Sequence, residues 1–313
     1  MFYKIENHNL EQIDFKILMQ AEDENLIGYL SAGELDEVAS KLSLPQAFID
    51  RCQMDTSHFH GNFEVYDEFS YGVINIVNIL NTYQARDRIG IFIRKNMLIF
   101  VEIIDEDESI HAIFNESIKR YTTNATKEKI LYGVLEMLID HANKHLELTE
   151  EEILKMEEQI VDGKIDNQLN RKIFRLRNEL SILDNYYEHL VELGEELQNN
   201  SNELFSGKEL RFLKIFSGKA ARLSANTKTQ SENLIHLREA HDAAVNYELN
   251  WIMKVFTVVT VVFLPLTLIV GWYGMNFTTM PELTWKYGYL FVICLSVIVL
   301  CASIFYFRKK KLL

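Results

Sequence analysis

The residues of this sequence that most clearly suggest chemistry are polar side chains recurring inside a long apolar segment near the C-terminal end. Spaced three or four apart, they share one face of a helix, and the full set is Asn246, Asn250, Met253, Thr257, Thr260, Leu264, Thr267 and Gly271. Such a face could line an aqueous path through a membrane. Two structural alternatives stay open, because threonine can bond its own helix backbone and small residues can let helices pack closely.

Two nearly uncharged stretches follow one another in this region. Met253–Trp272 contains 20 residues and Tyr287–Phe307 contains 21, and each has the length that a helix needs to span the hydrocarbon core. Pro265 predicts a bend in the first span, either a hinge or a static kink. The basic run Arg308–Lys311 follows the second span and predicts a cytoplasmic C-terminus.

The connector between the spans, Tyr273–Lys286, is then expected on the outer side of the membrane. Aromatic residues gather at this end of both spans, as they do at membrane interfaces: Trp272, Tyr273, Trp285, Tyr287 and Tyr289. Two helices cannot enclose an aqueous path, so transport would require several copies of the chain around an axis.

The preceding part of the chain is strongly acidic. Residues 1–250 contain 26 basic and 44 acidic residues, a net charge of −18. Such a surface repels nucleic acid, which is not an expected partner, and attracts cations. The N-terminal segment lacks the apolar stretch of a secretory signal, so we expect residues 1–250 in the cytoplasm. We expect no enzymatic activity, because no Gly-rich phosphate loop or paired nucleophile and base stands out.

The first third of the chain predicts an α/β or α+β domain with a mixed or antiparallel sheet, and we take α/β as the fold class. Runs rich in β-branched and aromatic residues predict strands at Phe63–Tyr66, Gly72–Ile79, Ile89–Arg94 and Met97–Ile103. Helical spacing of apolar residues predicts helices at Glu34–Leu42 and Glu108–Thr122.

The middle of the chain predicts long helices. From Lys127 to about Asn200 the charged, proline-free pattern is typical of a two-helix hairpin interrupted near Asp162-Gly163. Acidic residues in Glu150–Glu158 form either a solvated face or a cation-attracting skirt. The predicted divisions are 1–126 (α/β domain), 127–207 (hairpin), 208–252 (stalk helix), 253–272 (first span), 273–286 (loop), 287–307 (second span) and 308–313 (basic tail).

Possible metal ligands outside the spans have weaker support. Cys52, Asp55, His58 and His60 all belong to ligand types, but their spacing matches no firm motif and structural roles are favoured. Cys294 and Cys301 lie within the second span and are expected to be reduced structural thiols.

The loop carries the most specific motif. Gly274-Met275-Asn276 follows Tyr273, and Pro281-Glu282-Leu283 comes five residues later. This arrangement, together with FLPLT in the first span and the terminal lysines, resembles the CorA-type magnesium and cobalt channels. The resemblance implies a funnel-shaped homopentamer in the plasma (inner) membrane, with the first span lining a pore and the second facing lipid.

The same resemblance assigns roles along the path. Asn276, with Gly274 and Met275, would form the selectivity filter, whose neutral carbonyl oxygens suit magnesium that keeps its water shell. Asn250, Met253 and Phe256 would form the inner narrow region, with Thr260, Leu264 and Thr267 above it. Cations would be attracted by Glu239, Asp242 and Glu282. No cofactor is expected beyond magnesium, as transported ion and possible regulator.

One departure from the resemblance concerns regulation. Family members are thought to bind intracellular magnesium through acidic residues that include acids on the upper stalk, whereas Lys208–Arg222 is mostly basic with Glu209 its only acid. Cobalt or nickel could pass the same ring as magnesium. Two alternatives stay open: a zinc transporter on the same scaffold, and a membrane-anchored coiled-coil scaffold that conducts nothing.

Overall fold

The computed structural model describes residues 1–14, 25–54, 63–163, 168–275, 280 and 285–310. These residues form two compact units. Unit 1 comprises Met1–Glu158 and Asp166–Leu237, and unit 2 comprises Gln159–Ile165 and Arg238–Leu313. Helix α7, Leu210–Tyr273, contributes residues to both.

A mixed sheet forms the centre of unit 1. Over the described residues it has seven strands in the order β2-β1-β3-β7-β6-β5-β4, with β3 and β7 parallel and the other neighbours antiparallel. The strands are β1 (Phe2–Glu6), β2 (Asn9–Ile13), β3 (Asn25–Ser31), β4 (Phe63–Val65), β5 (Phe69–Ile76), β6 (Asp87–Arg94) and β7 (Met97–Ile104).

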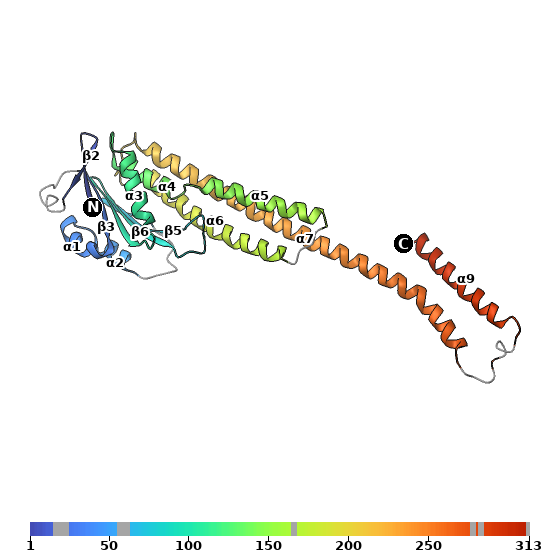
Figure 1. Cartoon of the computed structure of the whole chain (residues 1–313). Coiled ribbons are helices and arrows are strands. Elements are labelled where there is room, and N and C mark those ends of the chain that lie inside the picture. The colour runs from blue at the N-terminus through green and yellow to red at the C-terminus, as the bar shows by residue number, and fades with distance from the viewer. Residues whose placement is uncertain (15–24, 55–62, 164–167, 276–279, 281–284, 311–313) are drawn as a thin grey trace. The chain divides into compact units, whose positions relative to one another are not determined.

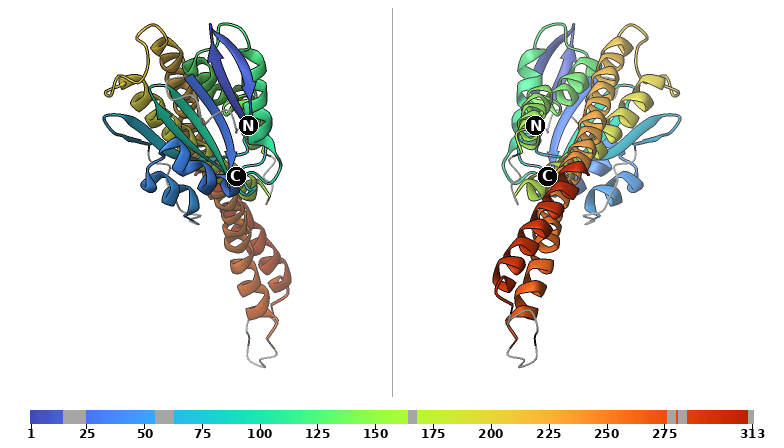
Figure 2. Two further views of the ribbon diagram at one scale, coloured as in Figure 1. Left: turned by 90° about the vertical axis from the view of Figure 1, so that its left-hand side faces the viewer. Right: turned by 90° about the vertical axis from the view of Figure 1, so that its right-hand side faces the viewer.

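Helices cover both faces of this sheet (Figure 2). On one face, α1 (Ala32–Leu42) and α2 (Gln46–Gln53) bury a cluster in which Phe48 packs on Phe92, with ring centroids 5.5 Å apart. On the other face, Phe114 of α3 (Ser109–Arg120) packs on Phe100 at 5.6 Å. Because each side of β5, β6 and β7 is covered, none of the residues of these strands is exposed.

Between Lys127 and Asn200 the structure has three helices where the sequence predicted two. They are α4 (Lys127–Met137), α5 (Ala142–Val161) and α6 (Leu169–Asn199). The expected helix from Lys127 to Asp162 is therefore wrong in one respect, since a turn separates α4 from α5. His141 in that turn has a left-handed φ of 64°. Because a residue other than glycine adopts this conformation here, no glycine or proline in the sequence marks the turn.

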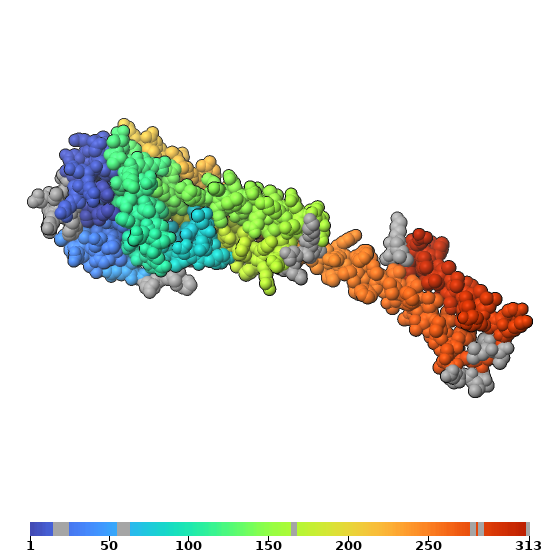
Figure 3. Space-filling view, viewed as in Figure 1, coloured from blue at the N-terminus to red at the C-terminus, as the bar shows by residue number. Residues whose placement is uncertain are grey.

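Unit 2 contains most of the apolar sequence. Helix α7 is 64 residues long, and α9, Gly288–Lys309, runs back beside its C-terminal part (Figure 1). The side chains of α9 lie against those of α7 (Figure 3). Both helices are long and apolar enough to cross a membrane.

Candidate functional site: a face of helix α7

The predicted stripe occupies one side of α7. Successive helical residues are rotated by about 100°, which places the candidates within an arc of about 120°: Glu239, Asp242, Asn250, Met253, Phe256, Thr260, Leu264 and Thr267. Val262, 8% exposed, lies opposite the centre of this arc. Only 6% of the most apolar window of α7 is buried in the single chain, so exposure alone does not identify the stripe. The buried Val262 marks the face of α7 opposite to the stripe.

The threonine hydroxyls of this face bond within the helix. Thr257, Thr260 and Thr267 donate to backbone oxygens four residues earlier at 2.7, 2.8 and 2.9 Å. This is the first structural alternative raised from the sequence, and it holds in the single chain. Each oxygen keeps acceptor capacity, so back-bonding leaves the threonines able to receive a hydrogen bond from water.

The helix ends at the first residues of the loop motif. The N–H of Gly274 donates to the oxygen of Val270 at 2.9 Å, and that of Met275 donates to the oxygen of Trp272 at 3.4 Å. A Cβ on Gly274 would lie 2.8 Å from the Val270 oxygen, a distance too short for any other residue. The helix end therefore requires glycine at this position. Asn276 and Glu282 lie outside the described residues.

At the other end of the stripe the acidic side chains have neighbours. Asp242 is 3.9 Å from Arg238 and 3.7 Å from His241, measured between charged or ring atoms. His241 is 4% exposed, and neither ring nitrogen has a hydrogen-bond partner among the described residues. Part of the negative charge expected of Asp242 is thus shared with Arg238.

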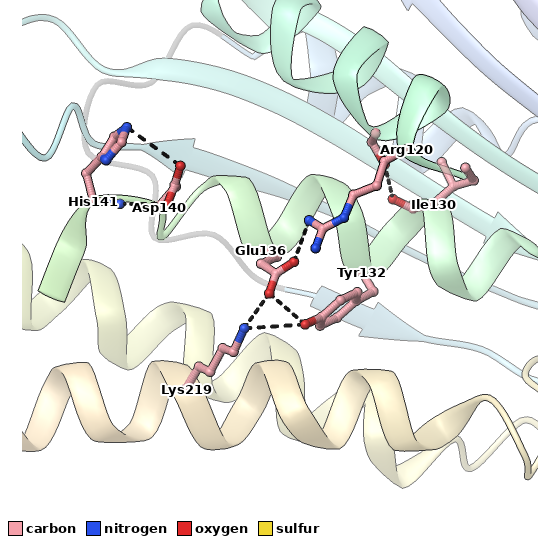
Figure 4. A network of polar contacts seen from close by, with 8 residues as sticks. Arg120, Ile130, Tyr132, Glu136, Asp140, His141 and Lys219 are labelled. Atoms are coloured by element: carbon pink, nitrogen blue, oxygen red, sulfur yellow. Dashed lines mark hydrogen bonds and ion pairs between the residues drawn. The ribbon is translucent and has the colours of Figure 1, made fainter. Parts of the chain in front are cut away.

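Within unit 1, a basic side chain of α7 holds this helix to α4. Lys219 donates to Glu136 of α4 and lies 3.4 Å from the Tyr132 hydroxyl, while Arg120 of α3 donates to the other Glu136 oxygen at 2.7 Å (Figure 4). Burial alone would raise the pKa of Glu136, but hydrogen bonds from Lys219 and Tyr132, with the charge of Arg120, hold it below its usual value. Glu209, the acid of this region, has a buried Oε2 atom with no partner in the described chain.

The carboxylates near the hairpin tip face solvent. Glu151 pairs with Lys155 at 3.6 Å and Glu152 with Arg175 at 3.9 Å. These contacts favour the solvated face over the cation-attracting skirt.

Of the four possible metal ligands near Cys52, only Cys52 itself lies within the described residues. Cys52 is buried on α2, where burial raises its thiol pKa to about 12, and its Sγ would lie 2.8 Å from a Cβ on Gly90. Such a thiol is a packing group and a poor metal ligand. Asp55, His58 and His60 lie outside the described residues. Cys294 and Cys301 are free and exposed in the single chain.

Sequence reasoning missed one acidic cluster. Asp87, at the start of β6, lies with Asp105 and Asp107 such that one oxygen from each is within 4.8 Å of the others. Burial, followed by repulsion from the two neighbours, raises the pKa of Asp87, while hydrogen bonds from Ser109 lower that of Asp107. Asp87 is 18 positions from Asp105, with strand β7 between them, so no spacing rule points to the cluster.

Known proteins resemble this chain over almost its whole length. The family model for the CorA-like Mg2+ transporter protein matches residues 29–309. The cobalt/magnesium transport protein CorA of Thermotoga maritima is 25% identical over 256 residues, which are 78% of this chain and 71% of that protein. The magnesium transport protein CorA of Wolinella succinogenes is 45% identical over 85 residues, and this match spans only about a quarter of each chain, 27% and 26%.

Solved structures share the fold. The CorA magnesium transporter of Methanocaldococcus jannaschii superimposes with a TM-score of 0.77 at 20% identity, covering 98% of this chain and 97% of that one. The cytoplasmic domain of ZntB from Vibrio parahaemolyticus gives 0.60 at 13% identity, over 79% of this chain and 97% of that domain. The α/β unit, the long helix and the two candidate spans are thus those of a known architecture. By the extent of its match to the family model, the chain belongs to the CorA-like Mg2+ transporter family.

Proposed function

We propose that this chain assembles as a homopentamer that conducts hydrated magnesium through a membrane into the cytoplasm. Family membership supports cation transport. The observation that carries the pore assignment is the common direction of the candidate side chains on α7, opposite the buried Val262. Five copies of this face around an axis would form a continuous lining from Glu239 to Thr267.

The proposed path has a filter and a gate. Asn276, next to Gly274 and Met275, supplies a ring of amide oxygens that accept hydrogen bonds from the water shell of magnesium. Met253 and Phe256 supply apolar rings that stop ions by dewetting when the helices close. Membrane potential, worth about 2.3 kcal/mol per charge per 100 mV and twice that for a divalent ion, is sufficient driving force.

Ion flux tests the proposal directly. Purified protein in liposomes with an inside-negative potential should take up magnesium, and Asn276→Ala should lower the rate at least about tenfold, equivalent to about 1.4 kcal/mol. Thr278→Ala, in the same loop, is the matched control and should conduct normally. Absence of magnesium uptake by wild-type protein in these liposomes contradicts the channel and favours the non-conducting scaffold.

The transported ion is a separate question. The relatives from Thermotoga and Wolinella are named for magnesium, and the first also for cobalt, whereas the likeness to ZntB is one of fold. Cobalt and nickel should compete with magnesium for the same ring, while zinc should compete weakly. Faster uptake of zinc than of magnesium would replace the magnesium proposal with the zinc alternative.

Two further experiments test the oligomeric state of the protein and its orientation in the membrane. Native mass spectrometry of detergent-solubilised protein should give a mass of five chains of 36.6 kDa. A cysteine introduced at Thr279 should react with an impermeant thiol reagent added outside the cell, and one introduced at Leu312 should not.

A further inference from the structure

A groove separate from the proposed ion path lies between α6 and the sheet in unit 1. It has a volume of 410 Å³, within the range of about 300–1,000 Å³ typical of small-molecule sites. Its walls come from β4, from β5, from the segment between β5 and β6, and from the middle of α6. None of the roles proposed for α7 uses it.

The groove is elongated because β5 and α6 run alongside each other in opposite directions. Asn202, just after α6, donates to the Tyr66 oxygen at 2.7 Å, beside the start of β5. At the other end, Tyr83, in the segment after β5, donates to the Arg175 oxygen of α6 at 3.2 Å. From Ile182 to Glu196 the wall formed by α6 is about 21 Å long at 1.5 Å per residue.

The middle of the groove has apolar side chains beside the polar Asn185 and His189. Ile74 contributes from the sheet, and Ile182, Leu190 and Leu193 contribute from one side of α6. A hydrated magnesium ion gains nothing from such a wall, because it keeps its water molecules. A chain of methylene groups buries its surface there favourably.

The two ends of the groove carry opposite charges. Glu192 and Glu196, one turn apart on α6, lie at the end near β4, where Glu192 Oε2 is 3.4 Å from His189 Nδ1. Glu64 is also at this end, but it already accepts hydrogen bonds from Arg51 at 2.7 Å and Tyr71 at 2.9 Å. Arg86 lies in the segment after β5, and so at the opposite end.

We propose that this groove binds a linear zwitterion. Its ammonium group pairs with Glu192 and Glu196, its apolar chain lies along Ile74 and Leu190, and its anionic group pairs with Arg86. The two charged ends set the orientation of the ligand, and the length of the groove selects ligands whose charges are far apart.

Binding to the full-length protein in detergent tests this assignment without any measurement of ion flux. The probe is 8-aminooctanoate, compared by calorimetry with octylamine and octanoate, each of which lacks one charged end. The zwitterion should bind at least about tenfold more tightly than either, as expected for one additional ionic contact worth about 1.4 kcal/mol. Equal affinities for all three, or no binding of the zwitterion at millimolar concentration, overturn the proposal.

Variants locate the two ends. The double variant Glu192→Gln/Glu196→Gln should weaken 8-aminooctanoate about tenfold and leave octanoate unchanged, whereas Arg86→Gln should do the same to the zwitterion and leave octylamine unchanged. Glu195→Gln, an exposed acid on α6 that does not line the groove, is the matched control. Asn185→Trp, at an exposed lining position, should fill the groove and abolish binding while the protein stays folded. Binding that survives Asn185→Trp places the probe elsewhere and overturns the proposal.

Discussion

The carbonyl oxygen of Val270 accepts a hydrogen bond from the Gly274 N–H at 2.9 Å, and the same oxygen would lie 2.8 Å from a Cβ atom on Gly274. The last turn of α7 can therefore close only around a glycine. This contact joins the proposed pore helix to the loop motif and leads to the first prediction.

Gly274→Ala should unwind or displace the end of α7, because the obstructing atom belongs to the backbone and cannot move aside. We expect the free energy of unfolding to fall by about 1–3 kcal/mol and magnesium flux to fall with it. Thermal unfolding in detergent and liposome flux measure the two effects. Gly271→Ala is the control for stability on the same helix, since a Cβ there has no atom within 4 Å in the described chain. An equal change in stability in the two variants contradicts the steric argument.

Lys127→Met should destabilise unit 1. The buried ammonium of Lys127 donates to the oxygens of Arg94, Lys95 and Leu204 at 3.1, 2.6 and 2.5 Å. Methionine removes the donor from these buried or partly buried oxygens, at a cost of about 1–3 kcal/mol. Chemical unfolding of the full chain measures the loss, with Lys129→Met, which removes one exposed bond, as the milder control.

The same lysine predicts a pH dependence. Burial lowers the pKa of Lys127 from 10.5 to about 8, so between these values the unfolded chain binds more protons than the folded one. Stability from this group is then present above pH 10.5 and is lost as the pH falls through 8. The stability difference between wild type and Lys127→Met should therefore widen from pH 8 to pH 10. A constant difference over this range contradicts the lowered pKa.

Asp87→Asn should stabilise the protein at neutral pH. Because the pKa of Asp87 is raised, the folded state binds this proton more readily than the unfolded state, and the associated stability is present at low pH and lost as the pH rises through the folded pKa. Asparagine removes the charge repulsion, so its melting temperature should exceed that of wild type at pH 7 and approach it near pH 4. Asp107→Asn should have the opposite sign at pH 7, because hydrogen bonds lower the pKa of Asp107.

His241→Leu should raise the free energy of unfolding. Both ring nitrogens of His241 are buried without a partner among the described residues, and an unpaired buried polar group costs about 1–3 kcal/mol. Leucine continues the buried stripe of Leu234 and Leu237 on the same side of α7. His236→Leu, at an exposed position one turn earlier, is the comparison and should change stability little. A loss of stability in His241→Leu shows that the imidazole has a structural role.

The sequence predicted those helices and strands whose apolar residues recur with a clear local period. The four predicted strands correspond to β4, β5, β6 and β7 within a few residues. The first predicted span corresponds to the C-terminal part of α7, and the second corresponds to α9. Strands β1, β2 and β3 were missed because their apolar residues are few or belong to short runs. The turn at His141 was missed because nothing in its composition separates α4 from α5. Contacts between distant segments, such as Asp87 with Asp107 or Glu136 with Lys219, are set by packing and leave no spacing to recognise.

The attachment of the stalk region to α4 has one consequence for control. Lys219 carries its positive charge on a covalently attached arm, so the charge facing Glu136 cannot diffuse away when the cytoplasm is depleted of metal. Because this ion pair lies within one chain, it does not depend on the concentration of a free ion as metal binding does. Salt weakens it only by screening the two charges. Depletion of metal therefore leaves this contact between α7 and α4 in place.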